Sequence, residues 1–234
     1  YVAGHASYDE AHIDLGALAR FANARFYHST VTGLDLREKQ VLCDDRPPVP
    51  FELASVNTGS TPNTSLVTGA TGNVVPVKPI NDFLDRWDAL SARAMAHEGP
   101  MRIAVVGAGA GGVGGCRNVA VADVEILLAI QHRLGQLRAG AGKPSDDIEF
   151  HLFSNTAEIL PTHNARVRRT FLGVLKQRNV MLHLGEPVAE VAPGKLTTAA
   201  GTTTEADEIL WVTAAGAPSW PGDAGLDVDE GGFI

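Results

Sequence analysis

The pattern of hydrophobic and polar residues changes partway along the chain. From residue 25 to residue 57, β-rich runs alternate with polar turns. Residues 25–36 and 39–44 predict a hairpin around Arg37-Glu38, and residues 51–57 predict a third, short strand after the break at "PPVP". Residues 61–78 are rich in threonine, asparagine, glycine and proline, which predicts loops and short extended pieces.

A helical period appears next, over residues 80–90. Hydrophobic residues recur there at spacings of three and four, which places them on one face of a helix, and Asn81 or Asp82 is expected to cap it. Gly99-Pro100 ends the helix, and we interpret it as a domain junction. The hydrophobic stripe consists of Ile80, Phe83, Leu84, Trp87 and Leu90.

From Met101 onward, strands and helices alternate. A strand–helix–strand unit followed by short strands indicates an α/β fold with a parallel sheet that carries an antiparallel meander. The predicted elements are a strand at 102–107, a helix at 124–137, a strand at 148–153, a helix at 165–178, and short strands at 180–185, 187–192, 195–199 and 208–216. The expected core is Ile103, Val105, Ile126, Leu127, Ile130, Leu152, Phe171, Leu175, Leu182 and Leu210.

Composition narrows the classes of function. A chain of 234 residues can bury a sizeable core in one large domain or two small ones. Its formal net charge of −8 argues against a sequence-independent nucleic-acid binder, which needs basic surface to neutralise phosphates. No hydrophobic run approaches the roughly 20 residues that span a bilayer. The two cysteines match no redox or metal spacing and the eight histidines form no H-x-x-x-H pair, so we expect no metal site.

A glycine-rich segment directly follows the strand at 102–107. Gly107, Gly109 and Gly112 satisfy G-x-G-x-x-G between a predicted strand and a predicted helix, which is the context that supports a dinucleotide-binding fingerprint. In such a site the first glycine permits a tight turn and the second lets a pyrophosphate approach the backbone. The third lets the helix pack closely on the strand. The segment therefore predicts a dinucleotide site.

A polar run over residues 114–123 separates this fingerprint from its helix. It contains two glycines and Asn118, which are poor helix formers, and Asp123, which is a good N-cap for a helix that starts at Val124. In one reading the helix start is displaced and the extra loop lies where the pyrophosphate would bind. In the other the run bulges outward and leaves the glycine amides available. The sequence leaves both readings open.

The choice between NADH and NADPH depends on the end of the next strand, where an acidic residue binds the ribose hydroxyls and an arginine accommodates a 2′-phosphate. The chain offers Ser154 and Asn155 there, followed by Glu158. Ser154 and Asn155 suit hydrogen bonds to a ribose, but they are equally typical of a strand-to-loop transition. We favour NADH.

Four segments together carry a family resemblance: "IAVVGAGAGGV…VEILLAIQHRL", "EILPTHNARVRR", "SVNTGSTP" and "VPVKPINDFLDRWDAL". They resemble the FAD-dependent pyridine nucleotide-disulfide oxidoreductase superfamily, in particular the type II NADH dehydrogenase-like proteins. More narrowly, they are similar to the oxidoreductase part fused to selenide, water dikinase in some bacteria. The resemblance implies a fold with two Rossmann-like dinucleotide-binding domains. Residues 1–97 would be the remainder of the FAD-binding domain, 98–217 the NAD(P)H-binding domain and 218–234 the start of the return to the FAD domain.

The resemblance also implies roles for single residues. Val31 matches a position whose backbone meets the adenine of FAD, and it is equally an ordinary strand residue. Thr58-Gly59 matches the segment that leaves the FAD domain near the flavin nucleotide, and Lys78 a position near the flavin. Glu125 matches a glutamate near the nicotinamide, or it is simply a solvated first-turn carboxylate. The cofactor-binding candidates are Gly107, Gly109, Ala110, Gly112, Glu125, Ser154, Gly216, Val31, Thr58, Gly59 and Lys78; no catalytic side chain is assigned.

The function implied is an FAD-dependent NAD(P)H oxidoreductase, in which a hydride passes from the nicotinamide to the flavin and then to a quinone or another acceptor. The cofactors FAD and NAD(P)H carry this chemistry. The alternative is a non-catalytic nucleotide-binding or regulatory module, or an inactive fragment. Because the chain starts without methionine and ends in an apparent strand, we expect a piece of a longer protein, incomplete at both ends. We expect a cytoplasmic location, with peripheral contact at the inner face of the membrane as the open alternative.

Overall fold

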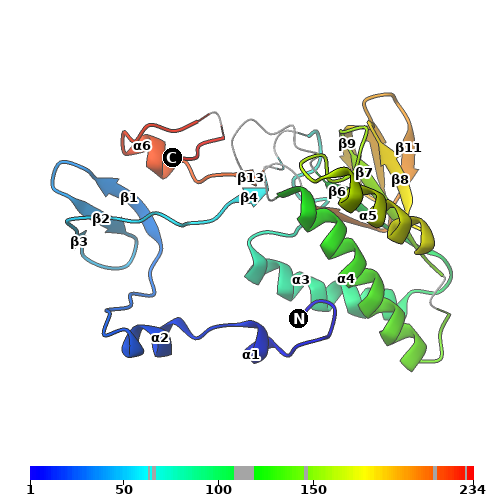
Figure 1. Ribbon diagram of the computed structural model, residues 1–234, viewed down its shortest axis with the longest axis horizontal. Coiled ribbons are helices and arrows are strands. Elements are labelled where there is room, and N and C mark those ends of the chain that lie inside the picture. Colours follow the sequence, from blue (N-terminus) through cyan, green and yellow to red (C-terminus); the bar gives the residue numbers. More distant parts are fainter. Residues whose placement is uncertain (63, 65–66, 108–118, 145–146, 213–214, 230) are drawn as a thin grey trace. The chain divides into compact units, whose positions relative to one another are not determined.

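The computed structural model contains two compact units, which are considered separately (Figure 1). Unit 1 comprises Tyr1 and residues 3–59 and 217–234, and unit 2 comprises Val2 and residues 60–216. The residues that the structure describes are 1–62, 64, 67–107, 119–144, 147–212, 215–229 and 231–234. No helix among these residues is long and apolar enough to cross a bilayer.

Unit 1 contains three short helices and a small antiparallel sheet. The helices are α1 (Tyr8–Ala11), α2 (Leu15–Phe21) and α6 (Trp220–Asp223), and the sheet has the order β1 (Val31–Asp35), β2 (Gln40–Cys43), β3 (Val49–Pro50). Ser7 and Glu10 form a capping box at α1, and the Asp14 carboxylate caps α2. The predicted hairpin around Arg37-Glu38 is confirmed by the antiparallel pairing of β1 with β2.

The prediction of a strand at residues 51–57 is wrong. The third strand is instead β3, within the "PPVP" segment that the sequence marks as a break. Pro50 pairs with Gln40 at the edge of the sheet, where a proline that lacks an N–H group is tolerated. After Phe51 the chain leaves the sheet, and the Leu53 side chain is 93% exposed.

Unit 2 is built on a five-stranded parallel sheet with the order β5-β12-β6-β7-β8. Strands β6 and β7 are buried on both faces over most of their length, as a sheet covered on both sides requires. This sheet confirms the predicted parallel arrangement. The strands are β5 (Val75–Pro76), β6 (Met101–Gly107), β7 (Ile148–Ser154), β8 (Met181–Leu184) and β12 (Glu208–Trp211).

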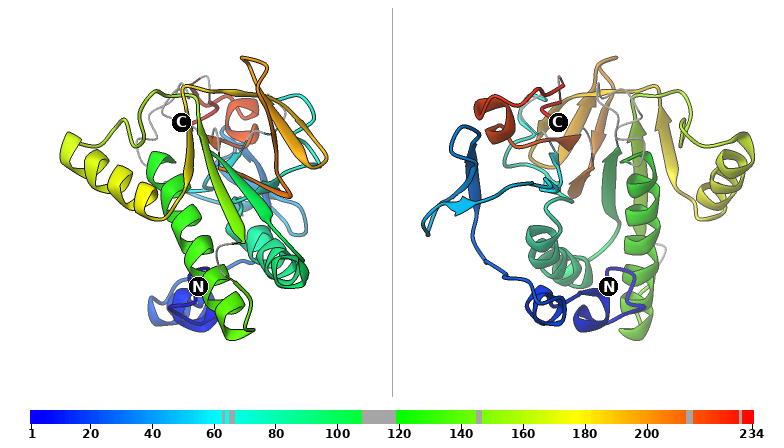
Figure 2. Two further views of the ribbon diagram at one scale, coloured as in Figure 1. Left: turned by 90° about the vertical axis from the view of Figure 1, so that its right-hand side faces the viewer. Right: turned by 60° about the vertical axis from the view of Figure 1, so that its left-hand side comes forward.

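Helices α3 (Ile80–Ala96), α4 (Val119–Gly140) and α5 (Ala165–Gln177) pack against one face of this sheet (Figure 2). The prediction of the core is confirmed for seven residues, which are buried: Ile103, Val105, Leu127, Ile130, Leu152, Leu175 and Leu210. Ile126, Phe171 and Leu182 are partly buried at its margin. The burial of Val105 and Leu127 confirms the strand–helix–strand assignment.

The other face of the sheet is covered by an antiparallel meander, β9 (Val188–Ala192), β10 (Lys195–Thr198) and β11 (Thr203–Glu205). Val191, Leu196 and Ala206 pack there against Val106 and other residues of the parallel sheet. Of the short strands predicted for the meander, those at 187–192 and 195–199 belong to it. The prediction is wrong for those at 180–185 and 208–216, which contribute β8 and β12 to the parallel sheet. The third strand of the meander, β11, was missed because its sequence, Thr-Thr-Glu, gives no hydrophobic signal. A short ladder of β4 (Thr61–Pro62) with β13 (Ala215–Gly216) completes unit 2.

The start of α3 differs from the sequence-based expectation. Pro79 occupies the N-cap position and makes no side-chain hydrogen bond, so neither Asn81 nor Asp82 is the cap. Proline fixes the backbone angle of the entry, and Asp82 lies in the first turn, where its charge favours the helix dipole. Since α3 packs with the parallel sheet, residues 60–97 belong to compact unit 2. The cofactor-domain limits 1–97, 98–217 and 218–234 stay a prediction.

Candidate functional site

The carboxyl ends of the parallel strands in unit 2 bring several predicted residues to one edge. Gly107 ends β6 and Ser154 ends β7, and the two residues are direct register partners. Ligands of open α/β sheets bind at the carboxyl ends of the strands, where a helix N-terminus follows. The first glycine of the fingerprint and the expected ribose contact are therefore adjacent. Gly109, Ala110 and Gly112 lie outside the described residues.

Gly107 is in close contact with Asp123 of α4. A Cβ atom added to Gly107 would lie 2.0 Å from Asp123 Oδ2 and 2.9 Å from Asp123 Cβ, so no larger residue fits. Gly107 does not have the positive φ that would by itself favour glycine. The close approach of α4 therefore requires a glycine at position 107, in addition to the tight turn that the sequence predicts.

The expectation that Asp123 caps a helix beginning at Val124 is wrong. Helix α4 begins at Val119, so Asp123 lies inside it. Alanines at 120 and 122 are strong helix formers and allow the earlier start. The Asp123 side chain is 7% exposed, and burial raises the pKa of its carboxyl group to about 7. Within the described part of the chain, its Oδ1 atom has no hydrogen-bond partner.

Ser154 lies at the end of β7, in a turn whose polar groups form hydrogen bonds with one another. Its buried Oγ lies 2.9 Å from Thr156 Oγ1, and the Thr156 backbone N–H donates to Ser154 Oγ at 3.3 Å. Glu158, the acidic residue considered for the ribose, forms an ion pair with Arg168 of α5. Asn155 is exposed beside this turn. The turn therefore presents neutral groups, with its nearby carboxylate and guanidinium paired to each other.

Lys78 and Gly216 both contact the short segment through which the chain enters unit 2. Lys78 Nζ donates a hydrogen bond of 3.4 Å to Ser60 Oγ, and Gly216 pairs with Thr61 in the β4–β13 ladder. The structure thus brings these two candidates to neighbouring positions on one short segment, residues 60 and 61.

The remaining candidates lie on unit 1 and on α4. Val31 begins β1 opposite Cys43 in unit 1, and Thr58 and Gly59 are exposed at the end of the same unit. Glu125 is exposed on α4, two residues after Asp123. Each of these residues stays a predicted cofactor contact.

Sequence reasoning missed a pair of histidines on β7 and β8, on the face of these strands that also carries Phe153. His151 Nδ1 lies 3.0 Å from His183 Nε2, and the His183 ring stacks on Phe153 with centroids 4.0 Å apart. Burial lowers the pKa of both imidazoles. No sequence spacing signals this pair, because only the register of two parallel strands brings the rings together.

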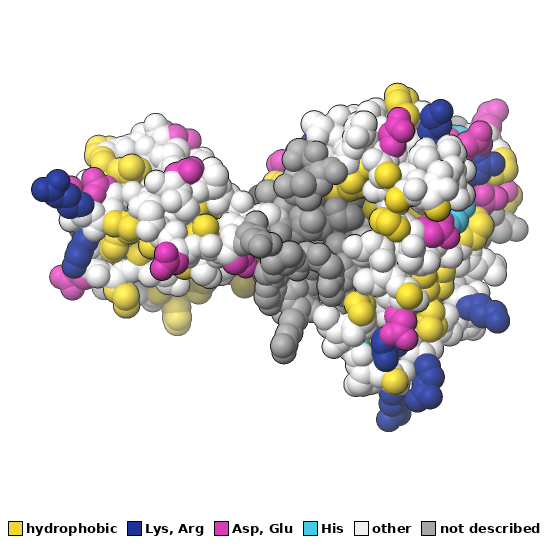
Figure 3. Space-filling view, turned by 90° about the horizontal axis from the view of Figure 1, so that it is seen from above, with side chains coloured by type: hydrophobic (Ala, Val, Ile, Leu, Met, Phe, Trp, Pro, Cys, Tyr) yellow, Lys and Arg dark blue, Asp and Glu magenta, His cyan; other side chains and the backbone are white. Residues whose placement is uncertain are grey.

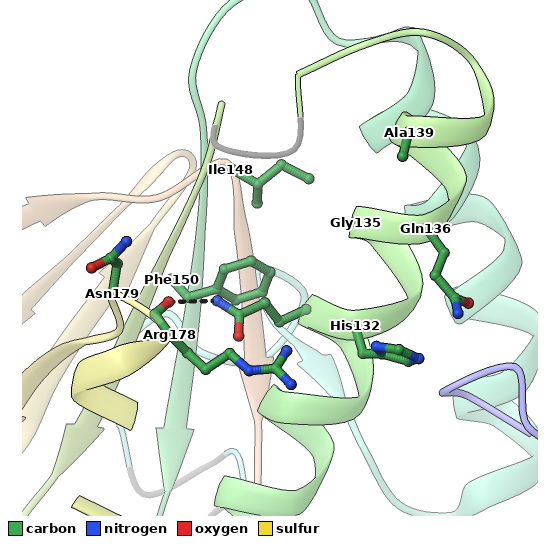
Figure 4. Close-up of a pocket in the computed structure, with 9 residues that line it drawn as sticks. His132, Gly135, Gln136, Ala139, Ile148, Phe150, Arg178 and Asn179 are labelled. Carbon is green, nitrogen blue, oxygen red and sulfur yellow. Dashed lines mark hydrogen bonds between the residues drawn. The ribbon is translucent and has the colours of Figure 1, made fainter. Parts of the chain in front are cut away.

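A cavity of about 500 Å³ lies away from this edge (Figure 4). It is bordered by the C-terminal half of α4, by the start of β7 and by the residues after α5, and Gln131 Nε2 donates to the Arg178 carbonyl at 2.9 Å. Ile148 and Phe150 belong to the start of β7, whereas Ser154 ends that strand, so the cavity does not coincide with the candidate site.

Charges of both signs are present on the face of the molecule drawn in Figure 3. On the face drawn in Figure 3, the lysine and arginine side chains of the described residues are scattered among acidic ones.

The family-model comparison identifies the fold and the family. The model named pyridine nucleotide-disulphide oxidoreductase matches residues 4–234. The chain therefore belongs to this family, as the resemblance in the sequence indicates. FAD and NAD(P)H are the cofactors that membership implies, in agreement with the expectation. A comparison with curated protein sequences gives no match.

Solved structures support the same fold. The NAD-dependent persulfide reductase of A. fulgidus aligns with a TM-score of 0.72 at 16% identity, over 100% of this chain and 41% of that one. The sulfide:quinone oxidoreductase of Aquifex aeolicus aligns with a TM-score of 0.71 at 14% identity, over 96% and 50%. NDH2 of Plasmodium falciparum, in complex with NADH, aligns with a TM-score of 0.66 at 14% identity, over 83% and 42%. The chain thus spans half or less of each of these proteins.

Proposed function

We propose that this chain is part of an FAD-dependent NAD(P)H oxidoreductase, with the nicotinamide dinucleotide bound at the carboxyl edge of the parallel sheet in unit 2. The observation that carries the proposal is the register pairing of Gly107 with Ser154, in a chain whose family match extends over residues 4–234. When bound, NAD(P)H supplies a hydride and the flavin accepts it.

The residues at this edge suit the parts of a dinucleotide to different degrees. The Ser154–Thr156 turn offers hydroxyl groups for a ribose, and the Glu158–Arg168 pair leaves neither a free carboxylate nor a free guanidinium. This neutral turn gives no strong selection for a 2′-phosphate, so NADH stays the favoured substrate. Ionised Asp123 beside Gly107 does not suit a pyrophosphate, whereas its neutral form does.

The FAD contacts proposed for unit 1 are the backbone at Val31 and the segment Thr58-Gly59. Lys78, next to Ser60, would place a cation near the flavin and stabilise its reduced, anionic form. For the final electron acceptor we propose a quinone or another small acceptor. A cytoplasmic location, peripheral contact with a membrane, and fusion to selenide, water dikinase stay predictions.

The rival function is a nucleotide-binding or regulatory module without turnover. One observation favours it, namely the buried carboxyl group of Asp123 beside the first glycine of the fingerprint. A charge at that position opposes an anionic ligand and would weaken NAD(P)H binding, so that reduction of the flavin by NAD(P)H would be slow or absent.

The two functions are distinguished by a spectroscopic titration. The protein is loaded with FAD, passed over a desalting column and titrated anaerobically with NADH. Loss of the oxidised flavin absorbance in proportion to added NADH supports the oxidoreductase. If NADH binds in calorimetry but the flavin stays oxidised, the module is correct. Deletion of residues 114–123 serves as a second variant, because it removes Asp123 together with the first residues of α4 and joins Val113 to Val124.

A further inference from the structure

Asp123 occupies the contact between the first glycine of the site and the helix that follows. Its Oδ2 atom lies where a Gly107 side chain would begin, and its side chain is 7% exposed. The Oδ1 atom is buried and has no hydrogen-bond partner among the described residues. In a dinucleotide fingerprint this close strand–helix contact is made by a glycine, which carries no charge.

We propose that Asp123 couples binding of the dinucleotide phosphates at the end of β6 to the uptake of one proton by its own carboxyl group. This inference rests on the proposed function, because it concerns the same nucleotide site. The proton comes from solvent and goes to a carboxylate oxygen of Asp123, and no other bond changes.

The protonated and the ionised forms of Asp123 have opposite effects on a phosphate. A protonated carboxyl group is uncharged and has an O–H donor that a phosphate oxygen can accept. An ionised carboxylate is an acceptor only and repels the phosphate in a surrounding of low dielectric constant. Since burial raises the pKa of Asp123 to about 7, the protein shifts between these forms near neutral pH.

No charged group in the described part of the chain compensates Asp123. On β6 the charged residue is Arg102, five positions before Gly107 and paired with Glu149 and Glu205. On α4 the next acidic residue is Glu125, whose side chain is exposed. The Glu158–Arg168 pair after β7 is already neutralised. None of these groups contributes to the raised pKa, which comes from burial.

The proposal predicts a specific dependence of NADH affinity on pH. If binding requires the neutral form, the dissociation constant rises about tenfold per pH unit above the pKa, and it is flat below it. At pH 8, one unit above the pKa of about 7, NADH binding then takes up about 0.9 protons, and at pH 6 about 0.1. Asp123→Asn, which keeps the shape and cannot ionise, should bind NADH about tenfold more tightly than the unmodified protein at pH 8.

The experiment is a set of calorimetric titrations of the whole 234-residue chain with NADH from pH 6 to pH 8.5. Two buffers of different ionisation enthalpy at each pH give the number of protons taken up. Asp88→Asn is the matched control, because Asp88 is an exposed aspartate of α3 in the same unit. The control should retain the pH dependence and the proton uptake, whereas Asp123→Asn should lose both.

The outcomes separate this inference from the function on which it rests. A pH-independent affinity in the unmodified protein, or equal proton uptake in Asp123→Asn, overturns the inference and leaves the nucleotide site intact. Absence of NADH binding at every pH, in both the unmodified protein and Asp123→Asn, overturns the inference together with the proposed function.

Discussion

Arg138 of α4 donates a hydrogen bond of 2.9 Å to the carboxylate of Asp147, the residue that directly precedes β7. The guanidinium is 2% exposed, and it also donates to the carbonyl groups of Ala94 and Pro144. One buried side chain therefore ties the end of α3, the end of α4 and the entry into the sheet together, with its charge and most of its donors satisfied.

Substitution of this arginine should destabilise unit 2 strongly. Arg138→Met leaves two carbonyl groups and Asp147, whose side chain is 36% exposed, without their donor, and leaving a buried acceptor unsatisfied costs about 1–3 kcal/mol. Urea unfolding monitored by tryptophan fluorescence measures the change. Arg169→Met, at an exposed position of α5, is the control and should change the free energy of unfolding by about 0.5 kcal/mol or less. Equal effects of the two variants would contradict the assigned role of Arg138.

A methyl group at Gly107 should also be destabilising, because the added Cβ would lie 2.0 Å from Asp123 Oδ2. We expect Gly107→Ala to cost about 1–3 kcal/mol through the shift of α4 that it forces. Gly135→Ala is the matched control, since a Cβ at this helical position of α4 meets no atom within 4 Å. It should stabilise the protein by about 0.5–1 kcal/mol. The double variant Gly107→Ala with Asp123→Gly should recover stability; no recovery would show that the clash lies elsewhere.

Asp123 should make the free energy of unfolding fall as pH rises. Its pKa is about 7 in the folded state and about 4 in the unfolded state, so the folded state holds the proton between these values. The stabilisation is fully present below about pH 4 and is lost by about pH 7, at most about 4 kcal/mol. Urea midpoints from pH 4.5 to pH 8 measure it. In Asp123→Asn this slope should disappear, and a persistent slope would assign it to another group.

The pair His151 and His183 should make the free energy of unfolding rise with pH, which is opposite to the effect of Asp123. Burial lowers the pKa of His151 and His183 in the folded state, so the unfolded state takes up protons first as pH falls through about 6.5. Stability is therefore present above that pH and is lost below it. In the Asp123→Asn background, the urea midpoint should fall between pH 7 and pH 5. His183→Phe should flatten this fall, whereas His163→Phe, at a half-buried loop position, should leave it in place.

Lys78 should influence the flavin if it lies beside the ring, as proposed. Lys78→Met removes the cation and should lower the midpoint potential of bound FAD, by roughly 30 mV for each 1.4 kcal/mol of lost stabilisation of the two-electron reduced form. Spectroelectrochemical titration of the FAD-loaded protein gives the potential. Lys176→Met, at an exposed position of α5, is the control. Equal potentials in the two variants would place Lys78 away from the ring, with the Ser60 contact as its whole role.

Local patterns determined the elements of unit 2 well. The hydrophobic runs at β6 and β7 and the helical period of α3 and α5 are signals that depend on a few neighbouring residues, and each element formed where its pattern predicts. Where the hydrophobic pattern is weak, pairing with a neighbouring strand determines whether a segment forms a strand. β3 and β11 are strands because a neighbouring strand supplies their hydrogen bonds, and neither carries a run of hydrophobic residues.

The sequence by itself determined the family, the glycine fingerprint and the order of strands and helices, because these depend on motifs read along the chain. The tertiary structure alone decided which side chains meet. Asp123 has the features of an N-cap in the sequence, yet it is a buried carboxyl group against Gly107, because α4 starts earlier and crosses the end of β6. His151 and His183 meet through the register of β7 and β8. Burial and register arise from packing between distant segments, and they set the charge state of these groups.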